Sequence, residues 1–254
     1  MTFSYLAIPD PNAMVLQFAR DEKRATVAFD KPLTAHETIG SAVTQVQTSI
    51  AAIAESLLNA AADLSDEGFT KEAVRLVDAK LVPAYGLAIE AAYKSRRDVD
   101  AEFDRLHLPR FPEASEPAVR AEQRAWWRSL SMPAKLEAAN ADSALAAAIV
   151  EGGQAMSAMP SDVFDRLRRD MAVAQLADNL ARSQDFRTPQ TPDNPIAGEP
   201  DREAARKNAV ARFDRLEAER ELLGTVTPLL SNVIDAVAVL TGETRQGAFD
   251  RLNA

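Results

Sequence analysis

Apolar side chains recur along residues 34–64 at alternating spacings of four and three positions. This spacing places one side chain per turn on a single helix face and is typical of the heptad seam between packed helices. Thr34 and Glu37 stand three residues apart, as in a capping box that would begin the helix. The pattern therefore predicts a long helix over 34–64, with a seam of Ile39, Val43, Val46, Ile50, Ile53, Leu57, Ala60 and Leu64.

The rest of this predicted helix is nearly uncharged. Residues 32–70 contain no Lys or Arg, and Glu55 is the only charged residue within 39–59. A helix on a domain surface normally carries a charged face. We therefore expect this helix to be covered on more than one side, either by its own chain or by further copies of it. Gln47 and Ala54 represent the positions off the seam that such a second contact would cover.

Helical patterns continue through most of the remaining chain. Residues 70–108 carry apolar side chains at helical spacing, and Pro83 predicts a bend near 81–86 because it removes a backbone hydrogen bond. We expect this segment to pack antiparallel to the first long helix. Together these patterns predict an all-α fold: an elongated helical bundle with long antiparallel helices and a small N-terminal appendage.

Two segments depart from the helical pattern. Within residues 1–33, the apolar runs 14–19 and 25–29 fit two strands, whereas the charged run between them fits a helix, so a hairpin and a helix both stay open. Residues 186–200 hold four prolines and predict an extended linker. The predicted segments are an N-terminal appendage (1–33), a main helical bundle (34–185), a Pro-rich linker (186–200) and a C-terminal helical segment (201–254).

The tetrapeptide Phe-Asp-Arg-Leu occurs four times, beginning at Phe103, Phe164, Phe213 and Phe249. Its unequal spacings do not fit a solenoid repeat. On a helix, the Phe and Leu of each copy share one face, so the tetrapeptide is interpreted as a reused packing turn. The alternative is a docking motif anchored by Phe and Leu, and it concerns mainly Phe249 and Leu252 in the last copy.

Two further features draw attention as candidate sites. Trp126 and Trp127 are adjacent and follow two arginines, and Trp and Arg are enriched at binding hot spots. We interpret them as one core Trp and one covering Trp, with an interaction patch as the alternative. His36 is interpreted as an exposed first-turn residue. His107 shares a helix face with Asp104, but the additional ligands of a di-iron site are missing.

Composition and charge narrow the classes of function. The chain has no cysteine, which excludes disulfides, thiol catalysis and Cys-ligated metals. Its net charge of −9 argues against nucleic acid as a partner. We expect no membrane span, because no apolar run approaches the required length. The first residues lack the features of a signal peptide, so we expect a cytoplasmic protein or a virion component.

No nucleotide-binding, phosphate-binding, metalloprotease or serine-hydrolase motif is present, so we assign no catalytic residue, cofactor or metal. The sequence favours a non-enzymatic structural or adaptor protein that self-associates through the 34–64 helix. Phage-like virion or assembly proteins have a similar composition, and so do many bacterial proteins. The alternatives are an all-α enzyme with a carboxylate-lined pocket, and an acidic helical inhibitor or regulator of a protein partner. The expected interaction residues are Ile39, Val43, Val46, Gln47, Ile50, Ile53, Ala54, Leu57, Trp126, Trp127, Phe249 and Leu252.

Overall fold

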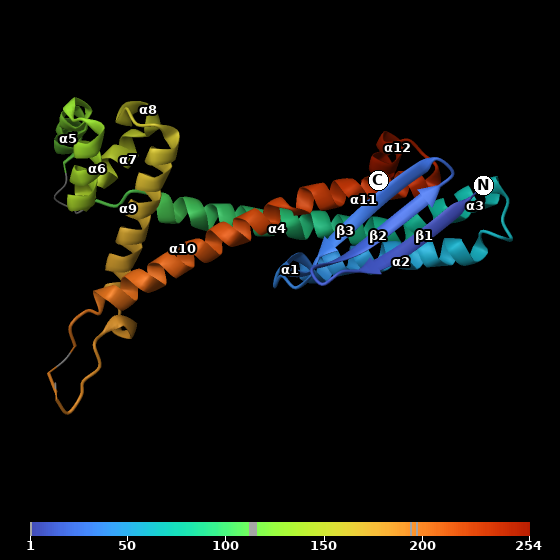
Figure 1. Ribbon diagram of the computed structural model, residues 1–254, viewed down its shortest axis with the longest axis horizontal. Helices are drawn as coiled ribbons and strands as arrows, with labels where there is room; N and C mark the ends of the chain where they lie inside the picture. Colours follow the sequence, from blue (N-terminus) through green and yellow to red (C-terminus); the bar gives the residue numbers. More distant parts are fainter. Residues whose placement is uncertain (1, 112–115, 194, 197) are drawn as a thin grey trace. The chain divides into compact units, whose positions relative to one another are not determined.

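The computed structural model describes residues 2–111, 116–193, 195–196 and 198–254 (Figure 1). Helices account for 71% of the residues and include stretches of about 40, and a small three-stranded antiparallel sheet lies at the N-terminus. The predicted all-α fold with long helices and a small N-terminal appendage is confirmed. The chain forms two compact units: unit 1 is Met1–Val99 with Glu219–Ala254, and unit 2 is Asp100–Ala218. The four segments expected from the sequence stay a prediction.

Unit 1 begins with the sheet, in which β1 (Phe3–Pro9), β2 (Ala13–Arg20) and β3 (Lys23–Asp30) pair in that order. The first 33 residues thus contain strands, and β2 and β3 form the hairpin that was one of the two alternatives. β1 is an additional strand that the sequence did not indicate. Its outer-face residues Leu6 and Ile8 are apolar and exposed, so the alternation typical of a half-buried strand is missing.

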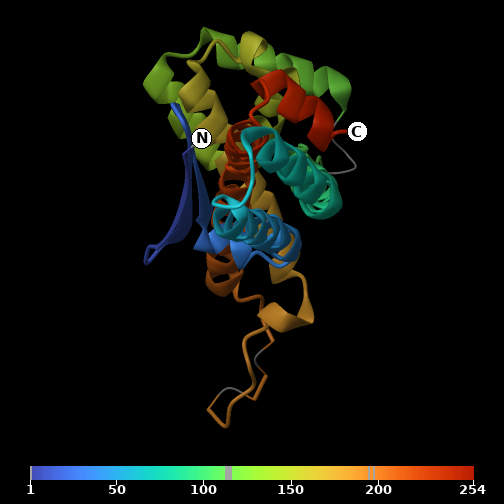
Figure 2. The same cartoon turned by 90° about the vertical axis from the view of Figure 1, so that its right-hand side faces the viewer.

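The sheet lies on one side of the helices of unit 1 (Figure 2). Phe18, Val27 and Phe29 on its inner face are buried, and β3 packs closely on α11. The other contacts of the sheet include α2 under β1. The helical elements of this unit are α1 (Lys31–Thr34), α2 (Gly40–Ala60), α3 (Asp66–Leu76), the π-helix η1 (Val77–Leu81), the first part of α4 (Val82–His107), the end of α10 (Arg202–Gly224), α11 (Val226–Thr241) and α12 (Arg245–Leu252).

The predicted start of the first long helix at Thr34 is wrong. Thr34 instead ends the short helix α1, and its hydroxyl donates to the Lys31 carbonyl at 3.1 Å. α2 begins only at Gly40, and a side chain at this position would collide with the backbone of Thr34. Pro32 near the start of α1 favours this separate short helix, because its fixed backbone angle suits the first helical turn.

Two cations of the sheet hold the end of α11. Arg20 donates to the Leu240 carbonyl at 2.9 Å, and Lys23 donates to the Gly242 carbonyl at 3.0 Å. The last carbonyls of a helix lack partners within the helix and attract positive charge. Gly242 follows α11 with φ +79°, which favours glycine, and Arg20 lies close to it. Arg20 also donates to the Thr70 hydroxyl of α3, so one side chain ties together the sheet, α3 and α11.

Unit 2 is helical, and its boundaries with unit 1 fall inside α4 and α10. Its core is formed by α7, in which Leu145–Val150 are all buried, together with Trp127 and the inner face of α9. Arg187 and Pro200, near the two ends of the Pro-rich segment 186–200, form an isolated antiparallel bridge. The other elements are α5 (Pro117–Ser129), α6 (Met132–Ala141), α7 (Ser143–Gly152), α8 (Gln154–Ser157), α9 (Ser161–Ala181) and the 3-10 turn η2 (Gln184–Phe186).

One helical stretch, Arg202–Thr241, is 40 residues long and contains a window of mean hydropathy 1.6, enough to cross a membrane by length and composition alone. Its apolar residues are concentrated in α11. Val233, Val237 and Leu240 of this helix are fully buried in unit 1. A core helix of a water-soluble fold has the same composition, so the stretch is weak evidence for a membrane span.

Candidate interaction surface

The heptad seam of α2 is part of the core of unit 1. Its six central residues are at most 1% exposed, and they pack toward the sheet, α3 and η1. Ala54, expected off the seam, is fully buried as well, and Gln47 is half-buried. Ala54 is buried because it lies one turn from both Ile50 and Leu57 and so borders the seam. The buried seam residues are Ile39, Val43, Val46, Ile50, Ile53 and Leu57.

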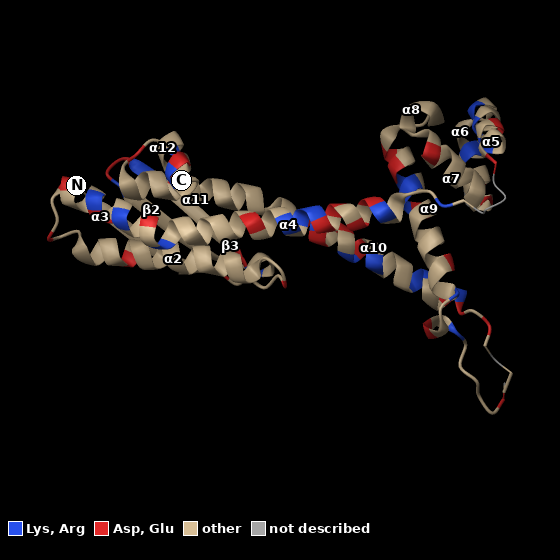
Figure 3. Ribbon diagram, turned by 180° about the vertical axis from the view of Figure 1, so that it is seen from behind, with Lys and Arg blue, Asp and Glu red and all other residues tan. Residues whose placement is uncertain are grey.

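The opposite face of α2 has no cover within the described part of unit 1. We call it the polar stripe, and its members recur three or four positions apart along the helix. Glu55 is its only charged member, and Figure 3 shows α2 almost free of charged residues. All members are exposed except Ala52, which is half-buried. The polar stripe consists of Ser41, Thr44, Gln45, Thr48, Ala52, Glu55 and Asn59.

Hydroxyl groups on this face are already hydrogen-bonded to the helix itself. Thr48 donates to the Thr44 carbonyl one turn earlier, and Ser56, beside the stripe, donates to the Ala52 carbonyl at 2.7 Å. Such local bonds satisfy the donor of a Ser or Thr side chain without water. Burial of these hydroxyls against another surface would therefore leave no unpaired donor.

Tyr5 of β1 lies near the charged member of the polar stripe. Its hydroxyl is buried and has no hydrogen-bond partner among the described residues. Burial raises the pKa of Tyr5, and the nearby carboxylate of Glu55 raises it further. The phenol therefore stays neutral at physiological pH and keeps a proton that it can donate.

The structure separates the two tryptophans. Trp127 is fully buried and its Nε1 donates to the Ser157 carbonyl at 2.9 Å, whereas Trp126 is 52% exposed. The preceding arginines point inward: Arg120 and Arg124 donate to Glu151 at 2.9 and 2.6 Å. These two guanidinium groups, first that of Arg120, hold the pKa of Glu151 below its ordinary value. Of the expected patch, Trp126 is the large apolar side chain that faces outward.

The four copies of the tetrapeptide share a buried leucine. Leu106, Leu167, Leu216 and Leu252 are all buried, which agrees with a packing turn and leaves Leu252 inside unit 1. The phenylalanines differ. Phe164 and Phe213 are buried, Phe103 is partly exposed, and Phe249 is 44% exposed.

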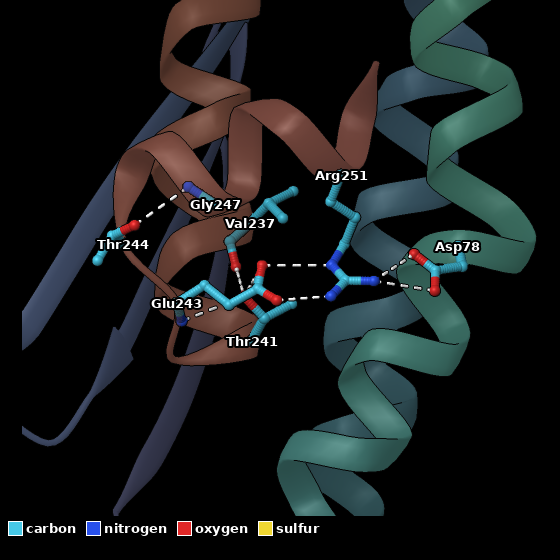
Figure 4. A network of polar contacts seen from close by, with 7 residues as sticks. All are labelled: Asp78, Val237, Thr241, Glu243, Thr244, Gly247 and Arg251. Atoms are coloured by element: carbon cyan, nitrogen blue, oxygen red, sulfur yellow. Dashed lines mark hydrogen bonds and ion pairs between the residues drawn. The ribbon is translucent and has the colours of Figure 1, made fainter. Parts of the chain in front are cut away.

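In the last copy, the arginine takes part in a network that Figure 4 shows. Arg251 donates to both carboxylate oxygens of Glu243, at 2.6 and 3.2 Å, and to those of Asp78 at 2.9 and 3.0 Å. The Thr241 hydroxyl adds a bond to Glu243 at 3.3 Å. These contacts hold the pKa of Glu243 below its ordinary value, the bond from Arg251 being the largest cause. The network joins α12 to η1, and the sequence alone did not indicate it.

His107 is part of the packed interior. His107 is buried between the rings of Phe103 and Phe213, and its Nδ1 bonds to the Phe103 carbonyl at 2.8 Å. Burial lowers the pKa of His107, so the ring is neutral at physiological pH. Nδ1 then carries the proton and donates it to the Phe103 carbonyl. Among the described residues, no group of three or more His, Asp or Glu side chains could hold a metal ion.

His36 is not the exposed first-turn residue that the sequence predicted. Because α2 begins at Gly40, His36 lies in the loop before the helix, and its side chain is 11% exposed. Its Nδ1 accepts the Thr38 N–H at 3.3 Å, and its Nε2 lies 3.4 Å from a carboxylate oxygen of Glu219.

Unit 2 contains a cavity of about 690 Å³ beside α9 and α10. Its apolar wall includes Leu167, Met171 and Val210, and its charged lining has more arginines than carboxylates. The charged lining residues are Arg166, Arg169, Arg202, Arg206, Asp170 and Asp178. Arg169 is already bound to Glu217 at 3.0 Å and to Asp214.

No protein-family model, no curated protein and no solved structure matches the chain. The function must therefore be argued from the residues themselves. Sequence reasoning recognised that the outside of the 34–64 helix lacks charge, but it named Gln47 and Ala54 for that surface. The signal for the exposed stripe was the spacing of Ser41, Thr44 and Thr48, directly opposite the seam.

Proposed function

We propose that this protein is a non-enzymatic structural or adaptor protein, and that copies of it associate through the polar stripe of α2. The observation that carries the proposal is an exposed helix face with one charged residue, Glu55, on a protein with a net charge of −9. Helix faces left in water normally carry more charge. The fold of unit 1 covers the seam and leaves this face open.

The chemistry of the stripe suits a contact between helices. Apart from Glu55 its side chains are uncharged, and the small ones among them let two helix backbones approach closely. Burial of charged groups would carry a large desolvation cost, whereas only Glu55 brings that cost here. The hydroxyl groups already bonded to the helix add little to it.

Charge limits where a second copy of the same chain can bind. Two chains that each carry a net charge of −9 repel one another over most of their surfaces. The polar stripe is a surface where they can meet with little repulsion. A two-fold contact would bring the stripe of one copy onto the stripe of the other, as in most homodimers.

The test is the mass of the protein in solution, measured by light scattering or sedimentation. Thr48→Glu places a carboxylate in the middle of the stripe and should lower the mass without loss of helical circular dichroism. Asn208→Glu, on an exposed position of α10, adds the same charge elsewhere and should leave the mass unchanged. In contrast, Ile53→Asp in the buried seam should unfold unit 1, since it buries an unpaired carboxylate.

Two results would overturn the proposal. One is a monomeric wild-type protein at high concentration, which would favour the enzyme or regulator alternatives. The other is an assembly whose mass changes equally, or not at all, in Thr48→Glu and Asn208→Glu.

A further inference from the structure

β3 is an open edge of the sheet in unit 1 (Figure 1). Within the described residues it pairs with β2 alone, in one continuous register from Ala13↔Asp30 to Arg20↔Lys23. A groove of about 570 Å³ lies between the start of β3 and α11. The groove is lined by residues that include Lys23, Arg24, Thr26, Asn232, Asp235 and Val239.

Alternate residues of β3 direct their backbone groups to the open edge. One residue beyond the strand, the Lys31 N–H donates to the Asn12 carbonyl at 2.8 Å and so continues the register with β2. Hydrogen-bonded positions alternate along an antiparallel ladder, so the odd-numbered residues of β3 bond to β2. The N–H and C=O groups that face the open edge belong to Arg24, Thr26, Ala28 and Asp30.

When two β3 strands pair about a two-fold axis, the side chains at these positions are complementary in charge. Arg24 and Asp30 lie at opposite ends of β3, and both are exposed. An antiparallel pairing in which the two Val27 residues face each other puts Arg24 of one copy opposite Asp30 of the second copy. Directly opposite side chains lie on the same face of a sheet, and opposite charges there are stabilising. Because a two-fold axis relates the two copies, this ion pair forms twice.

The other edge of the sheet, β1, is poorly suited to such pairing. The Asp10 N–H donates to the Ala13 carbonyl at 2.9 Å in the β1–β2 hairpin, so the neighbouring Pro9 faces outward. Proline has no N–H for a further strand, and proline on an edge strand is a common protection against pairing. β1 also contains no charged residue. β3 contains neither proline nor a bulge.

We infer that β3 is a second self-association surface, at which the β3 strands of two copies join antiparallel into one continuous sheet. The backbone groups of the four outward-facing residues supply the hydrogen bonds, and Arg24 and Asp30 set the register. The inference does not rest on the polar stripe. Together, two separate two-fold surfaces on one chain link copies beyond a dimer, as an assembly protein requires.

A charge swap tests the register, and it is done in the Thr48→Glu protein so that the polar stripe does not contribute. This protein should be dimeric. Arg24→Asp or Asp30→Arg alone sets like charges opposite each other and should weaken dimerisation roughly tenfold or more at low ionic strength. The double variant Arg24→Asp/Asp30→Arg restores opposite charges and should return the dimer to near its original strength.

The results separate the two proposals. If the Thr48→Glu protein is a monomer, or if the double variant dimerises no better than the single ones, the β3 inference is overturned. If the wild type forms an assembly and the Thr48→Glu protein is a monomer, the polar stripe is the sole contact between copies. If instead Thr48→Glu does not lower the mass and the β3 charge reversals dissociate the assembly, the polar stripe proposal fails and the β3 inference stands.

Cysteine cross-linking tests the same pairing directly, because the natural chain has no cysteine. In the inferred register Thr26 of one copy is opposite Ala28 of the other, at about 5.5 Å between Cα atoms, within disulfide range. A mixture of Thr26→Cys and Ala28→Cys proteins should form a disulfide-linked mixed dimer under mild oxidation. Ser4→Cys, on the exposed face of β1, is the control. Equal cross-linking of mixture and control would overturn the inference.

Discussion

The third and fourth copies of Phe-Asp-Arg-Leu turn different side chains inward. In α10, Phe213 is fully buried and Arg215 is exposed. In α12, Phe249 is 44% exposed, and Arg251 lies between two carboxylates. The leucine is buried in both copies. The shared tetrapeptide therefore determines an inward leucine, and the surrounding helices decide whether the phenylalanine or the arginine joins it.

The neighbours explain this difference. Phe213 meets the ring of His107 edge-on at 5.4 Å between centroids, in an apolar contact between α4 and α10 within unit 2. Next to α12, η1 and the loop after α11 present Asp78 and Glu243, which form ion pairs with Arg251. An identical local sequence can thus serve an apolar or a charged contact, because Phe and Arg lie on either side of the leucine around the helix.

The largest expected effect separates the two phenylalanines. Phe213→Ala should lower the free energy of unfolding of unit 2 by about 3–5 kcal/mol, because it leaves a cavity in a packed core. Phe249→Ala should change the stability of unit 1 by no more than about 0.5 kcal/mol. Hydrogen exchange of α10 and α11 measures both effects, and tryptophan fluorescence reports on unit 2, which contains both tryptophans. Equal losses of stability in the two variants would contradict the conclusion that only Phe213 is packed in a core.

The arginines should show the reverse order. Arg251→Met removes hydrogen bonds to Glu243 and Asp78 and should destabilise unit 1 by about 1–3 kcal/mol. Arg215→Met is the matched control, and its effect should stay within about 0.5 kcal/mol, since this side chain is exposed. Urea unfolding followed by hydrogen exchange of α12 for Arg251→Met, and of the unit 2 part of α10 for Arg215→Met, compares them. If Arg215→Met lowered the free energy of unfolding as much as Arg251→Met, the network around Arg251 would not explain the difference between the two copies of the tetrapeptide.

The histidine beside Phe213 should make unit 2 sensitive to acid. Burial lowers the pKa of His107 from its ordinary value of 6.5, so the unfolded chain binds its proton more readily than the fold does. Stability should therefore be full above about pH 6.5 and fall as the pH drops from there through the lowered pKa of the folded state. The urea midpoint of tryptophan fluorescence should shift between pH 7 and 5, and His107→Gln should remove that shift.

The smallest effect concerns the carboxylate beside Arg251. The pKa of Glu243 is lowered from 4.5, first by its hydrogen bonds from Arg251, so its contribution is present above pH 4.5. That contribution should be lost as the pH falls through the lowered pKa. Amide protection factors in α12 should fall in this acid range in the wild type, whereas Glu243→Gln should show no such fall. A variant that still follows the wild-type profile would assign the acid effect to other groups.

Much of the fold followed from local periodicity. The seam from Ile39 to Leu57 could be predicted because apolar residues at helical spacing must leave water wherever the helix packs. The hairpin of β2 and β3 was one of two alternatives, and the charged residues between the strands concealed the turn. The polar stripe was recognisable as a lack of charge. Its exact members depend on which side of α2 the sheet and η1 cover.

Contacts between distant residues decided the rest. β1 has little sequence signal of its own and forms by pairing with β2, while Gly40 begins α2 because its backbone passes close to Thr34. The sequence by itself determined which long segments are helical and that each leucine of the tetrapeptide is buried, since both depend on spacing along one element. Only the tertiary structure decided that Arg251 is bound, that Phe249 is exposed and that β3 has an open edge. Each of these depends on residues that folding brings together from distant parts of the chain.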